Sequence, residues 1–259
     1  MSTFLFDKIV FGPVKSRRLG VSLGINLLPT NLKICSFDCI YCECGWNQKK
    51  QTYSHSLPSK SEVKEKLAEK LAEMQVAGEL PDVITFAGNG EPTLHPDFAG
   101  IIDDTLELRD SLAPKARIAV LSNSSMIHKK AVFDALLKVD DNILKLDSAF
   151  EETVQLLDCP KGDFSLQKVV EQLAAFNGKV TIQTMFVKGS FKSKTVDNTT
   201  EKEVNAWIEL LQKIKPQNVM IYTIDRDTPL NTLRKVPMEE LNAIAQKVKT
   251  AGFPVQVSG

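Results

Sequence analysis

The residues most suited to chemistry are cysteines, four of which lie in one short stretch of this 259-residue sequence. Cys35, Cys39 and Cys42 follow the spacing C-x3-C-x2-C, and Cys44 comes two positions later. Cysteine thiolates are the usual ligands of iron-sulfur clusters, and three of them can bind three irons of a [4Fe-4S] cubane. The spacing therefore predicts a cluster held by a loop at residues 35–44, with one iron left open to a small molecule.

The same cysteines also suit two other kinds of site. With Cys44 as a fourth ligand they would form a tetrahedral four-thiolate zinc site, although zinc sites usually use two separated C-x2-C pairs. Cys39 and Cys42 alone would form a redox dithiol, which leaves Cys35 without a role. Cys159 stands apart from this group, and we expect it to be inert.

Short apolar segments alternate with helical segments along the chain, and these elements must position the cysteines. Each apolar segment is typical of a buried strand, and each is followed by a turn and an amphipathic helix. The expected strands cover residues 22–29, 83–87, 118–121, 143–147, 180–187, 219–224 and 255–257. The first expected helix covers residues 59–78, with a capping box at its start and a glycine at its end. The other expected helices lie near residues 98–106, 130–137, 166–176, 204–214 and 238–250. Residues 11–20 are expected to be a cationic loop before the first strand.

Six or seven β/α units predict an α/β fold, because parallel strands need helical crossovers. The sheet is either barrel-like or doubly wound. In both arrangements ligands bind just beyond the carboxyl ends of the strands. Polar and glycine-rich residues should therefore gather at that edge.

One such group is Gly88-Asn89-Gly90-Glu91, which follows the second expected strand. Glycines let the backbone approach a ligand closely, and a carboxylate beside them can pair with an ammonium group. The structural alternative is a tight turn with a solvated glutamate.

The next two strands also end in polar residues that could bind a cofactor: Ser122 with Asn123, and Lys145 with Asp147. Gln183 lies along the strand after them and could do the same. Lys145 could pair with a carboxylate of the ligand, or with Asp147 in a structural salt bridge. Gln183 could contact a cofactor or satisfy polar groups of the core.

The charge balance indicates no general affinity for polyanions, since 32 Lys and Arg match 32 Asp and Glu. A local basic group remains in the sequence: Lys15, Arg17, Arg18, Lys49 and Lys50. At the mouth of an active site these side chains would contact phosphates; otherwise they form a solvated rim. The start of the chain lacks a signal peptide and no apolar run is long enough to cross a bilayer, which predicts a cytoplasmic protein with no membrane partner.

The cysteine spacing, with Tyr41 directly before Cys42, resembles the signature of the radical S-adenosylmethionine (radical SAM) superfamily. The resemblance implies a partial (β/α)6 TIM-like barrel forming one core domain, residues 1–259, with the cysteine loop after the first strand. It implies a [4Fe-4S] cluster whose open iron binds S-adenosylmethionine, reductive cleavage to a 5′-deoxyadenosyl radical, and hydrogen abstraction from a substrate. It also implies an electron donor such as reduced flavodoxin or ferredoxin.

The resemblance carries residue roles with it. Cys35, Cys39 and Cys42 would bind the cluster. Cofactor contacts would come from Tyr41, Gly88, Asn89, Gly90, Glu91, Ser122, Asn123, Lys145, Asp147 and Gln183. The 88–91 stretch is similar to the superfamily's glycine-glycine-glutamate motif, which holds the methionyl amine, although Asn89 separates the glycines here. No catalytic residue is implied.

Further motifs, among them Gly12-Pro13-Val14 and Gln183-Thr184, resemble the branch that includes the wyosine tRNA-modifying synthases. That branch makes tRNA one expected substrate, with a peptide or a small metabolite as the alternative. Those synthases carry further upstream cysteines for a second cluster, whereas no cysteine precedes Cys35 here. We therefore expect a single-cluster variant. A zinc-stabilised, non-catalytic RNA-binding module is the alternative outside the enzymes.

Overall fold

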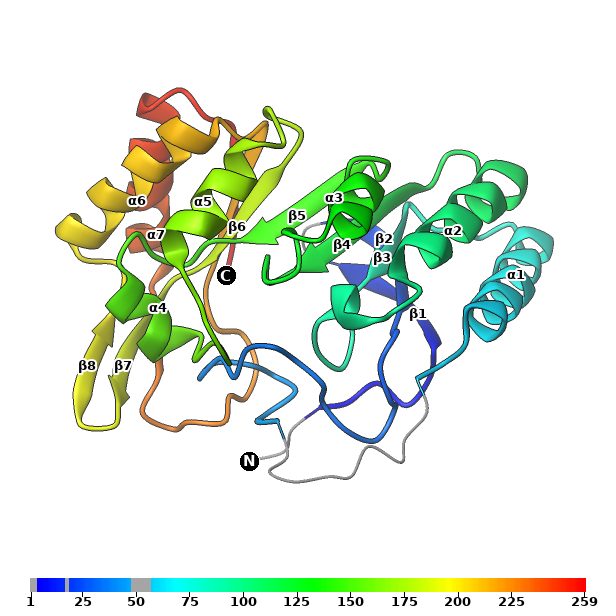
Figure 1. Ribbon diagram of the computed structural model, residues 1–259, viewed down its shortest axis with the longest axis horizontal. Coiled ribbons are helices and arrows are strands. Elements are labelled where there is room, and N and C mark those ends of the chain that lie inside the picture. The colour runs from blue at the N-terminus through cyan, green and yellow to red at the C-terminus, as the bar shows by residue number, and fades with distance from the viewer. Residues whose placement is uncertain (1–3, 17–18, 48–56) are drawn as a thin grey trace.

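The computed structural model describes residues 4–16, 19–47 and 57–259. Within them, eight strands form one curved sheet in the order β1-β2-β3-β4-β5-β6-β9-β11. The strands are β1 (Val10–Ser16), β2 (Gly20–Ile25), β3 (Val83–Phe86), β4 (Arg117–Ser122), β5 (Asp141–Lys145), β6 (Thr181–Met185), β9 (Asn218–Tyr222) and β11 (Val255–Ser258). The sheet curls into a half-barrel with helices along its outer side (Figure 1). The expected partial barrel is confirmed, and the doubly wound alternative is wrong.

The pairing of the strands brings their carboxyl ends to one edge of the sheet. Within this eight-stranded sheet every neighbouring pair from β2 to β11 is parallel, and β1 pairs antiparallel with β2. The segment after β2 contains the cysteines, and the segment after β3 contains the glycine-glutamate turn. Parallel pairing therefore places the two motifs beside each other.

The two faces of the sheet contain different side chains because strand residues alternate in direction. The outer face packs under the helices and includes Ile84, Phe86 and Val120, all fully buried. The inner face is filled near the amino ends of the strands by a separate small cluster that includes Ala119 and Ile143. Burying each large aliphatic side chain stabilises the fold by roughly 1.5–3 kcal/mol.

Seven α-helices occur in the described ranges, and two of them match their sequence signals closely. All seven are α1 (Lys60–Ala77), α2 (Phe98–Leu112), α3 (Lys130–Leu136), α4 (Glu151–Leu157), α5 (Leu166–Ala174), α6 (Glu201–Ile214) and α7 (Met238–Thr250). The Ser59 side chain accepts from the backbone N–H of Glu62, and Gly78 ends α1 in the left-handed region at φ 73°. α7 has the expected bounds.

The structure departs most from the sequence predictions in three places. Residues up to Ser16, expected as a loop, form strand β1, because hydrogen bonding to β2 outweighs the turn-like composition. The strand expected at residues 180–187 ends at Met185, and the chain continues into a separate sheet of β7 (Val187–Phe191), β8 (Lys194–Asp197) and β10 (Arg234–Lys235). Helix α4 was likewise not expected.

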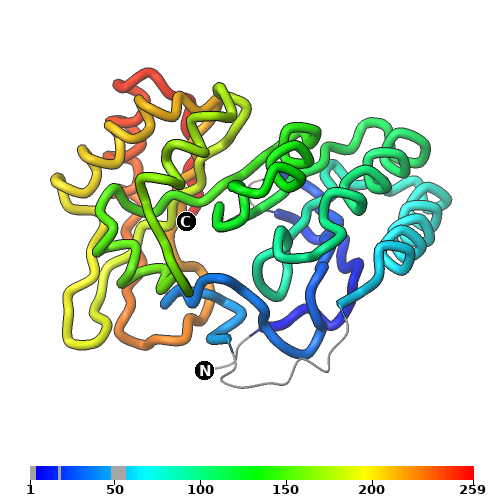
Figure 2. The backbone as a smooth tube through the Cα atoms, in the orientation of Figure 1, coloured from blue at the N-terminus to red at the C-terminus, as the bar shows by residue number. Residues whose placement is uncertain are grey.

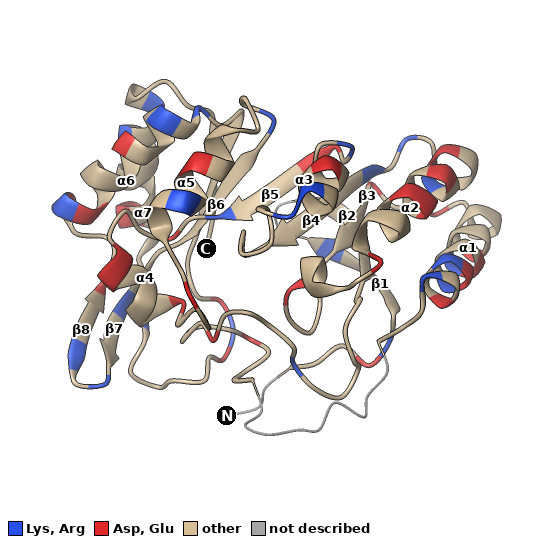
Figure 3. Ribbon diagram, in the orientation of Figure 1, with Lys and Arg blue, Asp and Glu red and all other residues tan. Residues whose placement is uncertain are grey.

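Positively and negatively charged residues are mixed along the outer helices, as Figure 3 shows for α1, α2 and α5. This mixing agrees with the balanced composition. In the part of the chain that the structure describes, every helix is too short or too polar to cross a membrane.

Candidate active site

The cysteine loop is joined to the glycine-glutamate turn by backbone hydrogen bonds. Ile34 N–H donates to the carbonyl of Asn89 at 2.9 Å, and Glu91 N–H donates to the carbonyl of Ile34 at 3.0 Å. Gly90 makes this contact possible, since its φ is 139° and a Cβ there would lie 1.8 Å from the oxygen of Ile34. The residue directly before Cys35 is therefore fixed by the second motif.

All five cysteines are free thiols, and the three expected cluster ligands lie in different surroundings. The Cys35 sulfur accepts from the backbone N–H of Phe37 and from Nδ2 of Asn123, each at 3.4 Å. Burial, followed by the nearby Glu91 carboxylate, raises the pKa of Cys35 to about 11. Both effects favour the neutral thiol of Cys35 over its thiolate.

Cys42 has the opposite environment. The Cys44 thiol donates a hydrogen bond to Cys42 and, together with the Lys33 ammonium, holds the pKa of Cys42 below its ordinary value. The same bond raises the pKa of Cys44, whose sulfur also lies 3.4 Å from the carbonyl oxygen of Gly88. In this structure Cys44 therefore acts as a hydrogen-bond donor that favours the thiolate form of Cys42.

The second half of the loop is closed by polar contacts that sequence reasoning missed. Asp38 Oδ1 accepts from the backbone N–H of Asn47 at 2.7 Å and from its Nδ2 at 2.8 Å, and Asn47 Oδ1 accepts from Cys35 N–H at 2.9 Å. Lys33 Nζ donates to the carbonyl of Gly45 at 2.8 Å. The sequence signal for these contacts was weak, since it consisted of Lys33 before the cysteines and Asn47 after them.

Glu91 is buried and accepts four hydrogen bonds. The donors are the backbone N–H and hydroxyl of Thr93, the Ser122 hydroxyl at 2.8 Å and the backbone N–H of Asn123 at 2.6 Å. Burial raises its pKa above the ordinary value. The turn is thus not solvated as its structural alternative assumed, and an added ammonium group would share the carboxylate with Ser122 and Asn123.

Four other polar side chains form a buried network on the far side of the loop. Lys145 Nζ lies 2.9 Å from Asp147 Oδ2 and 3.3 Å from Asp158 Oδ1. The Tyr41 hydroxyl bonds to both carboxylates and to Lys145, and the distance to Asp158 is 2.9 Å. The salt bridge between Lys145 and Asp147 is therefore confirmed, whereas no signal in the sequence pointed to Asp158. Cys39 is buried beside this network, near Lys145 and Asp158.

Two other expected cofactor residues have protein partners. The Asn89 side chain bonds to both backbone groups of Phe6 and to the carbonyl of Pro29, at 2.8–2.9 Å. Gln183 Nε2 donates to the Tyr222 hydroxyl at 3.0 Å. Their cofactor contacts stay predictions, and Asn89 also ties the start of the chain to the site.

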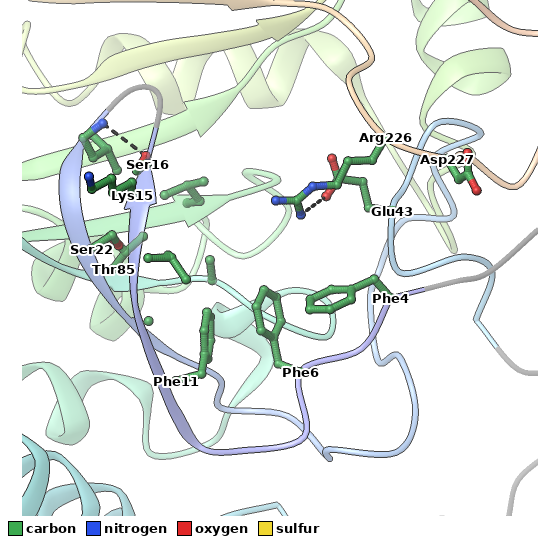
Figure 4. A pocket seen from close by; sticks show the side chains of 15 residues that line it. Phe4, Phe6, Phe11, Lys15, Ser16, Ser22, Glu43, Thr85, Arg226 and Asp227 are labelled. Atoms are coloured by element: carbon green, nitrogen blue, oxygen red, sulfur yellow. Dashed lines mark hydrogen bonds and ion pairs between the residues drawn. The ribbon is translucent and has the colours of Figure 1, made fainter.

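A cavity of about 700 Å³ opens on the inner face of the half-barrel (Figure 4). The rings of Phe6 and Phe11 stack in its wall with centroids 3.7 Å apart. Phe11 lies against Gly24, where an added Cβ would be 2.1 Å from the ring. At one side Arg226 forms an ion pair of 2.9 Å with Glu43, which stands between two of the cysteines in the sequence.

The start of the chain runs beside the cysteine loop, as Figure 2 shows. Phe4 N–H donates to the carbonyl of Glu43 at 3.0 Å. Of the basic residues singled out in the sequence, Lys15 lies on β1 and lines the cavity. The others, Arg17, Arg18, Lys49 and Lys50, lie outside the described residues.

The donor set fits a thiolate-bound cluster. Three thiols lie on one short loop, neutral donors point at one sulfur, and a cation adjoins another. Among residues 4–16, 19–47 and 57–259, no three His, Cys, Asp or Glu side chains surround a point that could hold a single metal ion.

Solved structures share this fold at low sequence identity. A radical SAM methyltransferase from Sphaerobacter thermophilus matches with a TM-score of 0.65 and 13% identity, covering 92% of this chain and 65% of the other. The structure of TYW1 with a lysine-pyruvate adduct bound matches with a TM-score of 0.61 and 16% identity, over 88% of this chain and 73% of the other. These likenesses confirm the fold that the resemblance to the superfamily implies.

Curated relatives are more similar in sequence. The chain is 31% identical over 257 residues to the protein named GTPase Obg of Brachyspira hyodysenteriae and 33% identical over 219 residues to a UPF0026 protein of Methanocaldococcus jannaschii. The alignments cover 98% and 83% of this chain, but the chain spans only 35% and 63% of these relatives. The family model described as the Radical SAM superfamily matches residues 32–197, which include the cysteine loop, the glycine-glutamate turn and strands β3 to β6. This chain belongs to the radical SAM superfamily.

Proposed function

We propose that this chain is an enzyme that cleaves S-adenosylmethionine reductively and abstracts hydrogen from a substrate in the cavity of the half-barrel. The carrying observation is the backbone connection between Ile34 and the 89–91 turn, which fixes the cysteine loop against the Glu91 carboxylate. Membership of the superfamily supports the chemistry. We further propose that residues 1–259 act as one catalytic core, in the cytoplasm, with a reduced flavodoxin- or ferredoxin-type protein as electron donor.

In this proposal Cys35, Cys39 and Cys42 hold a [4Fe-4S] cluster. When bound, the cluster would supply the electron that splits S-adenosylmethionine into methionine and a 5′-deoxyadenosyl radical. Asn123 and Phe37 orient Cys35 through their hydrogen bonds to its sulfur. The low pKa of Cys42 favours the thiolate that an iron needs.

The residues around the turn would bind the cofactor. Gly88 and Gly90 allow close approach, and Glu91 would share its negative charge with the methionyl amine. Ser122 and Asn123 hold that carboxylate in place. Tyr41, Asn89, Lys145, Asp147 and Gln183 complete the proposed set.

An RNA base is the substrate class we favour, and the cavity wall supports it. Stacked Phe6 and Phe11 suit a planar ring, and Lys15 and Arg226 suit a phosphate group. Arg226 would have to leave Glu43 to do so. A peptide or a small metabolite is the other outcome of the test.

The test is anaerobic reconstitution of the whole chain with iron and sulfide, followed by reduction with S-adenosylmethionine present. We expect about four irons per chain and formation of 5′-deoxyadenosine. Cys42→Ala should lose both, whereas the matched control Cys159→Ser should keep both, because Cys159 lies in the loop after α4 and outside the ligand group. An intact cluster that yields no 5′-deoxyadenosine would contradict the proposed function.

The same assay distinguishes the substrate classes. Addition of unmodified tRNA should raise 5′-deoxyadenosine formation several-fold, and its binding should weaken steeply with salt because phosphate contacts release counterions. Stimulation by a tRNA-free metabolite extract, with none by tRNA, would favour the alternative.

A further inference from the structure

Lys33 is a buried cation two residues before the first cysteine. Only 2% of its side chain is exposed. Burying an ammonium group without compensating interactions is costly. The groups around Lys33 should therefore indicate which interactions of its charge compensate for the burial.

Its direct partners only partly neutralise that charge. Lys33 Nζ donates to the carbonyl of Gly45 at 2.8 Å and lies 3.6 Å from Asp38 Oδ1, beyond an ideal hydrogen bond. Asp38 is itself shared, since it accepts two hydrogen bonds from Asn47 and lies 3.7 Å from Lys161 Nζ. The Asp38 carboxylate is therefore divided between two cations and an amide.

The remaining neighbours of the ammonium are the thiols. Lys33 hydrogen-bonds to Cys42, and its charge interacts with Cys42, Cys35 and Cys39, in decreasing order. Among the described residues, the other hydrogen-bond donors to Cys35 and Cys42 are uncharged: Asn123 and the backbone of Phe37 bond to Cys35, and the Cys44 thiol bonds to Cys42. Lys33 is thus a full positive charge whose field reaches all three proposed ligands.

We propose that Lys33 is a positioning residue that stabilises negative charge on the three thiolates and raises the reduction potential of the cluster they hold. This inference rests on the proposed function, because it requires that cluster. The reduced cluster carries one more negative charge than the oxidised one, so a fixed cation in a poorly hydrated position stabilises it more. Net charge and hydrogen bonds to the sulfurs are known determinants of cluster potentials.

A purely structural role is the rival explanation, in which Lys33 only closes the loop through Gly45. The two explanations differ in what the loaded protein does. Loss of loop closure would lower iron content without setting the direction of a potential shift. Loss of charge would shift the potential in a fixed direction, and removing the opposite charge at Asp38 would shift it the other way.

The experiment is an EPR-monitored redox titration of reconstituted protein without S-adenosylmethionine, with iron content measured in parallel. Lys33→Met should shift the midpoint potential to more negative values, and Lys33→Arg should restore most of it. Asp38→Asn should shift it to more positive values. Lys161→Met is the matched control, since this lysine contacts the same carboxylate but is 49% exposed, and it should leave the potential unchanged.

The outcomes separate the two proposals. If the wild type assembles no cluster, the proposed function fails, and this inference with it. If wild type and Lys33→Met are equally loaded and share one potential, only the inference is overturned. If Lys33→Met takes up no iron, Asp38→Asn decides, because an unchanged or more negative potential there would overturn the charge effect.

Discussion

Two buried lysines flank the cysteine loop, and their partners differ. Lys145 contacts two carboxylates, Asp147 and Asp158, together with the Tyr41 hydroxyl. Lys33 contacts a backbone carbonyl, one shared carboxylate and the thiols. The charge of Lys145 is therefore neutralised within the scaffold, whereas the charge of Lys33 is directed at the proposed ligands. The difference teaches that burial of a lysine alone does not define its role.

The largest expected effect comes from removing Lys145. Lys145→Met would leave Asp147 and Asp158 buried without their cation, which should lower the free energy of unfolding by about 3–5 kcal/mol. Lys33→Met in the metal-free protein loses chiefly the bond to Gly45 and should cost about 1–3 kcal/mol. Urea unfolding under reducing conditions measures both, and equal losses would break the distinction between the two lysines.

Glu91 differs from the carboxylates beside the two lysines, because it is buried and all its hydrogen-bond partners are neutral. Its contribution to stability should therefore depend on pH. Burial raises the pKa of Glu91 above its ordinary value of 4.5. The native state then binds more protons than the unfolded chain above pH 4.5, so this group makes stability fall as pH rises toward its raised pKa. The slope is at most about 1.4 kcal/mol per pH unit.

Glu91→Gln should remove that part of the pH dependence. Unfolding curves from pH 4.5 to 7 would show the wild type losing more stability than the variant across the range. A variant whose stability falls as steeply as that of the wild type would mean that Glu91 ionises normally in the folded protein. Iron content should change little, because Glu91 contacts the loop through its backbone.

Local sequence signals predicted the parts of the structure that depend on neighbouring residues. Ser59 and Gly78 delimit α1 because a cap and a left-handed glycine act within one turn. The glycine-glutamate turn was found because both its composition and its place after a strand are readable. The Gly12-Pro13 stretch misled, because turn-forming residues also occur in an edge strand that pairs across a hairpin.

Contacts between distant segments could not be predicted in the same way. Asp158 meets Tyr41 across 117 positions of the chain. Lys33 is close in sequence to the cysteines, yet nothing in the sequence says that its side chain folds back over them. Both contacts depend on the curvature of the sheet and the path of the loop, which the pattern of apolar residues does not encode.

The smallest expected effect concerns the hydroxyl of Tyr41. Tyr41→Phe removes its bonds to Asp147, Asp158 and Lys145 but keeps the ring and the ion pairs between lysine and carboxylates. The loss should be about 1–2 kcal/mol in urea unfolding, because the direct contacts of Lys145 still satisfy both carboxylates. Tyr222→Phe, which loses the bond from Gln183, serves as the matched control and should cost less. A loss for Tyr41→Phe as large as that for Lys145→Met would show that the hydroxyl, and not the ammonium, holds the network together.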